Sequence, residues 1–190
     1  MNPKELDPKE SLAIITKMIH QTQFNAKHQA VFFLLWGWLT LIAAIGHYLL
    51  LEVAHYKMPW IVWPIMMILG GVAAAIIGSR QARVKLTATH LDRSLAYLWG
   101  GFAVFLLTIL GCMPWIGFSK TYPIIMLLYA LGTFVTGGIL QFMPLKIGAI
   151  ACWLLAIAAF FVPFSLQLIL LGASIIVAYL IPGYLLQQKQ

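Results

Sequence analysis

The segment Arg80-Gln-Ala-Arg-Val-Lys-Leu-Thr-Ala-Thr-His-Leu-Asp-Arg93 separates two long apolar runs that carry almost no charge. It holds four fixed positive charges against a single carboxylate. A basic island between hydrophobic segments is typical of a connection that stays on the cytoplasmic side of a bilayer. The segment therefore predicts membrane-spanning helices on both of its sides and sets their orientation.

The composition of the whole chain excludes a water-soluble domain. Of the 190 residues, 62% are hydrophobic and only 9% are charged, whereas about 25% of the residues in an ordinary soluble domain are charged. A soluble fold of this size still exposes roughly 30% of its unfolded surface, which so few charged side chains could not cover. The sequence predicts an integral membrane protein whose main partner is the lipid bilayer.

The net charge of +7 follows from membrane topology. Basic residues lie singly or in short groups at the ends of apolar runs, where anionic lipid of the inner leaflet attracts them. We therefore expect no nucleic-acid partner. Cys112 and Cys152 lie inside apolar runs and lack the spacing of a disulfide or a metal site, so both are interpreted as small hydrophobic side chains. No cleavable signal peptide is predicted.

Residues 1–29 are polar, with apolar side chains at helical spacing. Asp7 suits a helix cap, Pro8 the first helical position, and Glu10 completes a capping box. One face of the helix then carries Leu12, Ile15, Met18, Ile19 and Ala26. This pattern predicts a cytoplasmic or interfacial amphipathic helix. It either leads along the membrane surface into the first span or docks a protein partner through residues 8–29.

Residues 30–186 contain six apolar runs. We expect an all-α, polytopic membrane helix bundle, with six transmembrane helices arranged as three helical hairpins. Helices of about 20 residues cross the roughly 30 Å of hydrocarbon in a bilayer. Pro144 and Pro163 mark tight turns that make neighbouring spans antiparallel. The expected spans are 30–53, 59–79, 95–118, 122–142, 145–162 and 164–186.

The distribution of basic residues supports an even number of spans. With the N-terminus inside, the outer segments hold Lys57 and Lys120 alone. The inner segments hold Lys4, Lys9, Lys17, Lys27, Arg80, Arg83, Lys85, Arg93, Lys146 and Lys189. Such a bias predicts a multi-pass protein of the bacterial cytoplasmic (inner) membrane with both termini in the cytoplasm.

An internal repeat links the first two hairpins. Leu35-Trp-Gly37 recurs as Leu98-Trp-Gly100, and the segment from Pro64 to Gly70 resembles the one from Pro123 to Gly132. The match predicts parallel copies of one hairpin about an axis normal to the membrane. The alternative is a chance similarity between helices that share a Leu, Ile and Gly alphabet.

Small residues spaced four apart line the even-numbered spans. Such faces let helix backbones approach closely and gain dispersion contacts. If all three faces point inward, spans two, four and six form the centre of the bundle; alternatively, one face makes a homo-oligomer. The residues expected to pack in this way are Gly71, Ala75, Thr133, Gly137, Ser174 and Ala178.

His47, Glu52 and His55 form the candidate functional cluster, toward the outer end of the first span. Histidine and carboxylate side chains on one helix face could bind a transition metal, relay a proton or sense external acidity. One helix alone cannot enclose a metal, so the alternative is an interfacial group in which Glu52 pairs with His55 or Lys57. We expect neither a metal nor a cofactor.

The sequence lacks the motifs of nucleotide-binding, zinc and nucleophilic enzymes, and we expect a non-enzymatic protein. The leading hypothesis is an integral membrane protein that acts as a scaffold, sensor or partner subunit. The alternative is a small channel or transporter for an uncharged or hydrophobic molecule. A water-accessible cavity lined by Thr133, Thr136 and Gln141 would favour that alternative.

The order of features near the N-terminus carries a resemblance. Glu10-Ser-Leu12 lies in the amphipathic segment, and the first span opens with Phe33-Leu-Leu-Trp-Gly-Trp38. In these features the chain resembles a group of small, uncharacterised bacterial six-helix inner-membrane proteins. The resemblance covers mainly the first 50 residues. It implies the six-helix architecture and brings no substrate or catalytic residue.

Overall fold

The computed structural model describes residues 29–84 and 90–188, and this part of the chain contains no strand. The amphipathic helix expected over residues 1–29 lies almost wholly outside the described residues. The first helix, Gln29–Val53, closes with a π-helical turn, η1 (Leu49–Val53). The elements that follow are η2 (Pro59–Ile61), α2 (Val62–Val84), α3 (His90–Ile116), α4 (Phe118–Ile139), α5 (Met143–Ala159), α6 (Phe164–Ile175), η3 (Ile176–Leu180) and α7 (Ile181–Gln188).

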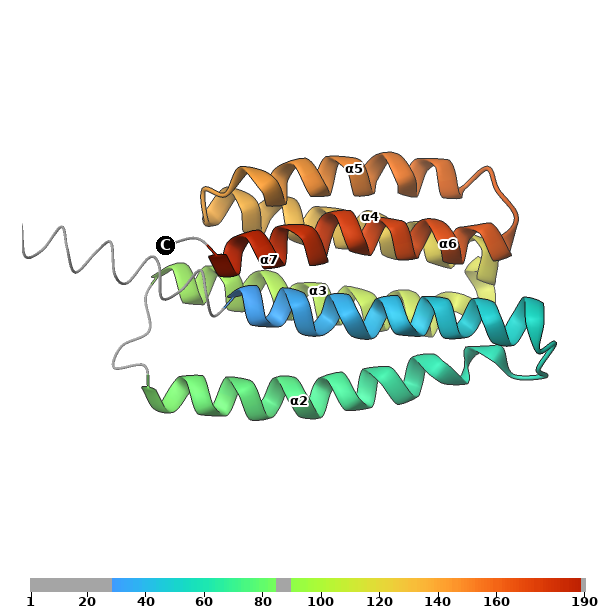
Figure 1. Ribbon diagram of the computed structural model, residues 1–190, viewed down its shortest axis with the longest axis horizontal. Helices are drawn as coiled ribbons and strands as arrows, with labels where there is room; N and C mark the ends of the chain where they lie inside the picture. The colour runs from blue at the N-terminus through green and yellow to red at the C-terminus, as the bar shows by residue number, and fades with distance from the viewer. Residues whose placement is uncertain (1–28, 85–89, 189–190) are drawn as a thin grey trace, which may run out of the picture.

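The helices run side by side as three antiparallel hairpins (Figure 1). α6, η3 and α7 form one continuous rod, Phe164–Gln188, called the sixth span below. Five helices are long and apolar enough to cross a membrane, and α5, at 17 residues, is shorter. The predicted all-α bundle of six helices is therefore confirmed, as is a multi-pass membrane protein.

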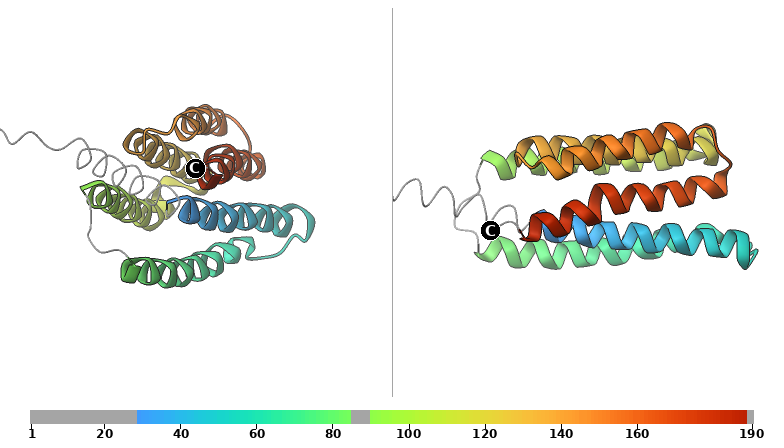
Figure 2. Two further views of the ribbon diagram at one scale, coloured as in Figure 1. Left: turned by 60° about the vertical axis from the view of Figure 1, so that its left-hand side comes forward. Right: turned by 45° about the horizontal axis from the view of Figure 1, so that its top comes forward.

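The centre of the bundle differs from the expected one. Buried residues concentrate on the first helix, α4 and the sixth span, and the sixth span lies between α5 and the first helix (Figure 2). Gly37 of the first helix makes this packing close, because a Cβ there would stand 2.8 Å from the side chain of Leu180. In contrast, α2 lies at the edge of the bundle, where Ile68 and Val72 are 67% and 57% exposed.

The helix ends follow from local chemistry. Gly117 has φ of 90° and alone separates α3 from α4; glycine adopts this left-handed conformation without a Cβ clash. The helices also extend further into the basic segment than expected, since α2 continues to Val84 and α3 begins at His90. Arg83 in the last turn of α2 and Asp92 in the first turn of α3 complement the helix dipoles there.

The first two hairpins share one internal contact. The ring of Trp36 covers Gly70 of α2, and the ring of Trp99 covers Gly132 of α4. The sequence repeat aligns Trp36 with Trp99, whereas Gly70 lies six residues after Pro64 and Gly132 nine residues after Pro123. The Trp–Gly packing therefore recurs in both hairpins although the two glycines are not in the same register of the repeat. In each hairpin, a side chain three residues after the tryptophan completes the contact, Leu39 in the first and Phe102 in the second.

The sixth span contains a π-helical turn with a clear cause. Pro182 lacks the N–H that would bond to Ala178, and the N–H of Ile181 bonds back to the carbonyl of Ile176. The loosened backbone lies directly against Gly148 of α5, where a Cβ would stand 2.5 Å from the carbonyl oxygen of Val177. The third hairpin is therefore held together by a backbone approach, unlike the Trp–Gly contact of the first two.

Candidate functional site

His47 lies inside the bundle, near the end where the first helix turns toward α2. Its side chain is only 3% exposed. Three aromatic rings surround it, one each from α2, α4 and α6, with ring centroids 6.5 Å away at Trp63, 6.0 Å at Tyr122 and 5.6 Å at Phe164. The imidazole therefore joins four helices at one point.

The hydrogen bonds of His47 define its protonation state. The indole Nε1–H of Trp63 donates to Nδ1 of His47 at 2.9 Å. Since an indole nitrogen can only donate, Nδ1 carries no proton. The hydroxyl of Tyr122, 3.1 Å from the same nitrogen, can then only donate as well. His47 is thus a neutral imidazole with its proton on Nε2, and the single lone pair of Nδ1 is shared between the donors of α2 and α4.

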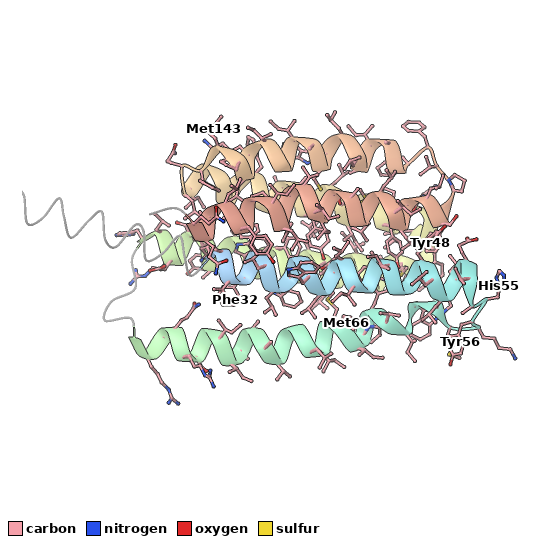
Figure 3. All side chains as sticks on the ribbon, in the orientation of Figure 1. Phe32, Tyr48, His55, Tyr56, Met66 and Met143 are labelled. Atoms are coloured by element: carbon pink, nitrogen blue, oxygen red, sulfur yellow. The ribbon has the colours of Figure 1, made fainter. Side chains whose placement is uncertain are left out.

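The other two members of the predicted cluster lie elsewhere. Glu52 is exposed in the π-helical turn, and His55 is exposed beyond it. Figure 3 shows His55 at the tip of the first hairpin, directed away from the bundle. Its φ of 47° is left-handed, which reverses the chain. No ion pair joins Glu52 to His55 or Lys57, and residues 29–84 and 90–188 contain no group of three side chains suited to a metal.

The small-residue stripes of α4 and the sixth span face inward. Thr133, Ser174 and Ala178 are 0% exposed, and Gly137 lies under α5, where a Cβ would stand 2.9 Å from that of Leu145. The stripe of α2 is different. Both Gly71 and Ala75 are exposed, and no described atom lies within 4 Å of where a Cβ at Gly71 would stand.

The α2 stripe therefore points away from the rest of the described chain, contrary to the expectation that all three stripes face inward. The physical reason is that Gly70, one residue earlier, supplies the contact with the first helix. A rotation of about 100° per residue places the next position on another face of the helix. Residues Gly71 and Ala75 are left on the open side of α2.

The three residues expected to line a polar path do not lie together. Thr136 donates to the carbonyl of Gly132 one turn back in its own helix, at 2.7 Å. Gln141 is exposed at the α4–α5 turn, with φ of 50°, and donates to the carbonyl of Gly138. Thr133 alone belongs to the interior polar group considered below.

A second group of polar side chains meets inside the bundle. Thr40 of the first helix lies beside Tyr129 of α4, and Thr133 lies beside Tyr179 of the sixth span. The rings of Tyr129 and Tyr179 contact each other edge to face, with centroids 5.4 Å apart. We refer to Thr40, Tyr129, Thr133 and Tyr179 as the hydroxyl cluster.

Comparison with known proteins does not extend this description. The chain matches no protein-family model, no curated protein and no solved structure. The resemblance to small bacterial inner-membrane proteins remains a prediction.

Sequence reasoning found His47 but missed its partners. Trp63 falls near the start of the predicted second span, and Tyr122 is the first residue of the predicted fourth span. A polar residue inside an apolar helix requires a hydrogen-bond partner, and indole and phenol groups near the same end of other spans are suitable donors. That signal narrows the choice of partner without identifying Trp63 and Tyr122, because it does not reveal which helices are neighbours.

Proposed function

We propose that the protein is a non-enzymatic scaffold of the bacterial inner membrane that associates with a second copy of itself through α2. The observation that carries this proposal is the open stripe formed by Gly71 and Ala75 on a membrane helix. Lipid chains gain little from such a groove, whereas a second helix backbone can approach it closely. The stripe is complementary to itself, as a two-fold symmetric dimer requires.

The repeated Trp–Gly contact supports the same conclusion. When Gly70 is aligned with Gly132, Gly71 corresponds to Thr133 and Ala75 to Gly137. On α4 these positions are buried, and the Gly137 end of the stripe receives α5. The equivalent stripe on α2 has no such helix within the described chain. We infer that a helix from a second copy takes the corresponding place.

The proposal includes an orientation in the membrane. Arg80, Arg83, Arg93 and Lys146 lie at one end of the bundle, at the ends of α2, α3 and α5. The positive-inside rule assigns this end to the cytoplasm. A cysteine introduced as Arg83→Cys should then resist a membrane-impermeant maleimide in intact cells, whereas Lys57→Cys should react. Labelling of Arg83→Cys but not Lys57→Cys would reverse the orientation.

Disulfide crosslinking tests the interface directly. Ala75→Cys, introduced after Cys112 and Cys152 are replaced by serine, should form an intermolecular disulfide in native membranes under mild oxidation. Closely packed helix backbones bring the two sulfur atoms within bonding reach. Leu69→Cys is the matched control: this residue is also exposed on α2 (54%), but it lies on a different face.

A second variant separates association from folding. Gly71→Leu should make the purified protein monomeric in lipid nanodiscs without lowering its thermal stability, because the added side chain enters open space within one chain. A wild-type protein that is monomeric at all concentrations would contradict the scaffold proposal. Equal crosslinking at positions 69 and 75 would contradict the assigned face.

One observation favours the second candidate function, a small channel or transporter for an uncharged molecule. The hydroxyl cluster places uncharged hydrogen-bonding groups near the middle of three helices. A swelling assay with proteoliposomes and glycerol tests this candidate. Faster swelling than in protein-free vesicles would support transport, and equal rates would leave the scaffold as the better proposal.

A further inference from the structure

The hydroxyl cluster is buried on every side. The exposed fraction is 1% for Thr40, 0% for Thr133, 2% for Tyr179 and 7% for Tyr129. The four side chains come from the first helix, α4 and the sixth span, the three elements that form the core. Phe33 and Trp99 close the cluster on another side, with ring centroids 5.0 Å and 6.5 Å from that of Tyr179.

Three oxygen atoms of this cluster have no hydrogen-bond partner among the described residues: Oγ1 of Thr40, Oγ1 of Thr133 and the hydroxyl of Tyr179. A buried hydroxyl without a partner is costly, and native proteins rarely leave one. Thr40 lies beside Tyr129 and Thr133 beside Tyr179, yet the oxygens of Thr40, Thr133 and Tyr179 do not meet hydrogen-bond geometry with these neighbours. A molecule held between the hydroxyls would satisfy them.

The two threonines depart from the usual behaviour of their residue type in a helix. Threonine in an apolar helix commonly donates to a carbonyl of the preceding turn. Thr108, Thr121 and Thr136 all do so here, to the carbonyls of Val104, Gly117 and Gly132. Thr40 and Thr133 make no such bond. Their hydroxyls remain available inside the bundle.

The π-helical turn supplies the third hydroxyl. Tyr179 lies within η3, and this widened turn depends on Pro182 and on the close approach of Gly148. A π-helical turn costs stability, and such turns are frequent at functional sites. Here the turn carries a tyrosine whose hydroxyl is buried beside Thr133.

We propose that the hydroxyl cluster binds ordered water between the first helix, α4 and the sixth span. Every group in the cluster is an uncharged hydroxyl that can both donate and accept, which suits water. An ion would lose its hydration without an opposite charge to replace it. A buried water typically makes about three hydrogen bonds to groups that would otherwise be unpaired. The contacts Thr40–Tyr129, Tyr129–Tyr179 and Tyr179–Thr133 link the three unpaired oxygens into one chain of neighbours. The proposal does not depend on self-association through α2.

The site can be tested by comparing the melting temperatures of single and double variants of two threonines on different helices. Thr40→Val and Thr133→Val each keep the side-chain shape and remove one hydroxyl. If water is bound, each should lower the melting temperature of the purified protein by about 2–6 °C, because the water loses a partner. The melting temperature of the double variant should fall by clearly less than the sum of the two single decreases, since the first substitution already releases the water.

The control is Thr136→Val, which has the same burial and lies on the same helix as Thr133. Its hydroxyl is already paired with Gly132, so its effect should add to that of Thr40→Val. If Thr133 instead bonds directly to Tyr179, substitutions at these two positions would have non-additive effects on the melting temperature. The effect of Thr40→Val would then add to that of Thr133→Val. Additive effects of Thr40→Val and Thr133→Val, or a higher melting temperature for both, would overturn the proposal.

An experimental structure of the wild-type protein tests the proposal even if the variants fail to fold. An experimental structure of the wild-type protein in lipid should show density within hydrogen-bond reach, roughly 2.7–3.0 Å, of the Thr40, Thr133 and Tyr179 oxygens. Continuous side-chain packing with no density there would overturn the proposal. The Thr133→Ser variant, which keeps the hydroxyl, should retain the density.

Discussion

Trp63 donates its indole N–H to Nδ1 of His47 across 2.9 Å, and this bond ties the start of α2 to the core. α2 has few other attachments, chiefly Gly70 against Trp36 and Val62 against Gly46. The histidine that the sequence suggests as a sensor is therefore also a structural joint.

Replacement of Trp63 by phenylalanine should loosen α2. The Trp63→Phe variant keeps an aromatic ring but loses the donor to His47, at a cost of about 1–2 kcal/mol in the free energy of unfolding. Thermal unfolding in detergent measures the change. Trp60→Phe is the matched control, since that side chain is 49% exposed and should cost little. Equal losses for the two variants would count against the joint.

The tautomer assigned to His47 can be tested by spectroscopy. We expect 15N NMR of labelled protein at neutral pH to show a neutral imidazole protonated on Nε2, since Nδ1 accepts from Trp63. In Trp63→Phe and Tyr122→Phe the Nδ1 resonance should shift as each donor is removed. A proton found on Nδ1 would contradict the assigned hydrogen bonds. His55, which is exposed, provides the solvent reference.

The backbone approach at Gly148 should tolerate no side chain. A Cβ there would stand 2.5 Å from the Val177 carbonyl oxygen, and neither backbone can move easily. Gly148→Ala should therefore destabilise the protein by about 2–3 kcal/mol, as measured by thermal unfolding. Gly100→Ala, where no described atom lies within 4 Å, should be neutral or gain up to about 1 kcal/mol in helix propensity. Similar stabilities for the two variants would show that the approach is looser than described.

The two repeated Trp–Gly contacts should respond unequally to the same substitution. A Cβ at Gly70 would stand 2.8 Å from the Trp36 ring, whereas at Gly132 the nearest atom is 3.4 Å away. Gly70→Ala should cost about 1–3 kcal/mol as the ring is displaced. Gly132→Ala should cost less than about 1 kcal/mol, because the contact is of ordinary van der Waals length. A larger loss at Gly132 would contradict this order.

The helices themselves were predictable because lipid imposes their length and composition. Apolar runs, Pro144 and Pro163 mark the spans to within a few residues. The predicted helix ends near Arg80 and Arg93 were less accurate, because long basic side chains let a helix continue beyond the hydrocarbon.

The position of α2 was not predictable from its sequence. Gly71 and Ala75 have the same spacing as Thr133 and Gly137, yet one stripe is open and the other buried. Small-residue spacing indicates where two helices could approach but does not identify the partner. The surroundings of His47 were hidden for the same reason, since Tyr122 is 75 positions away along the chain. The π-helical turn did have a local signal in Pro182.

The short α5 has a consequence for the surrounding membrane. Its 17 residues rise about 25 Å, whereas a typical hydrocarbon core is about 30 Å thick. Lipid beside α5 must therefore shorten its chains locally, while the 27-residue α3 on another side does not require this. The two flanks of the bundle therefore present helices of unequal length to the surrounding lipid.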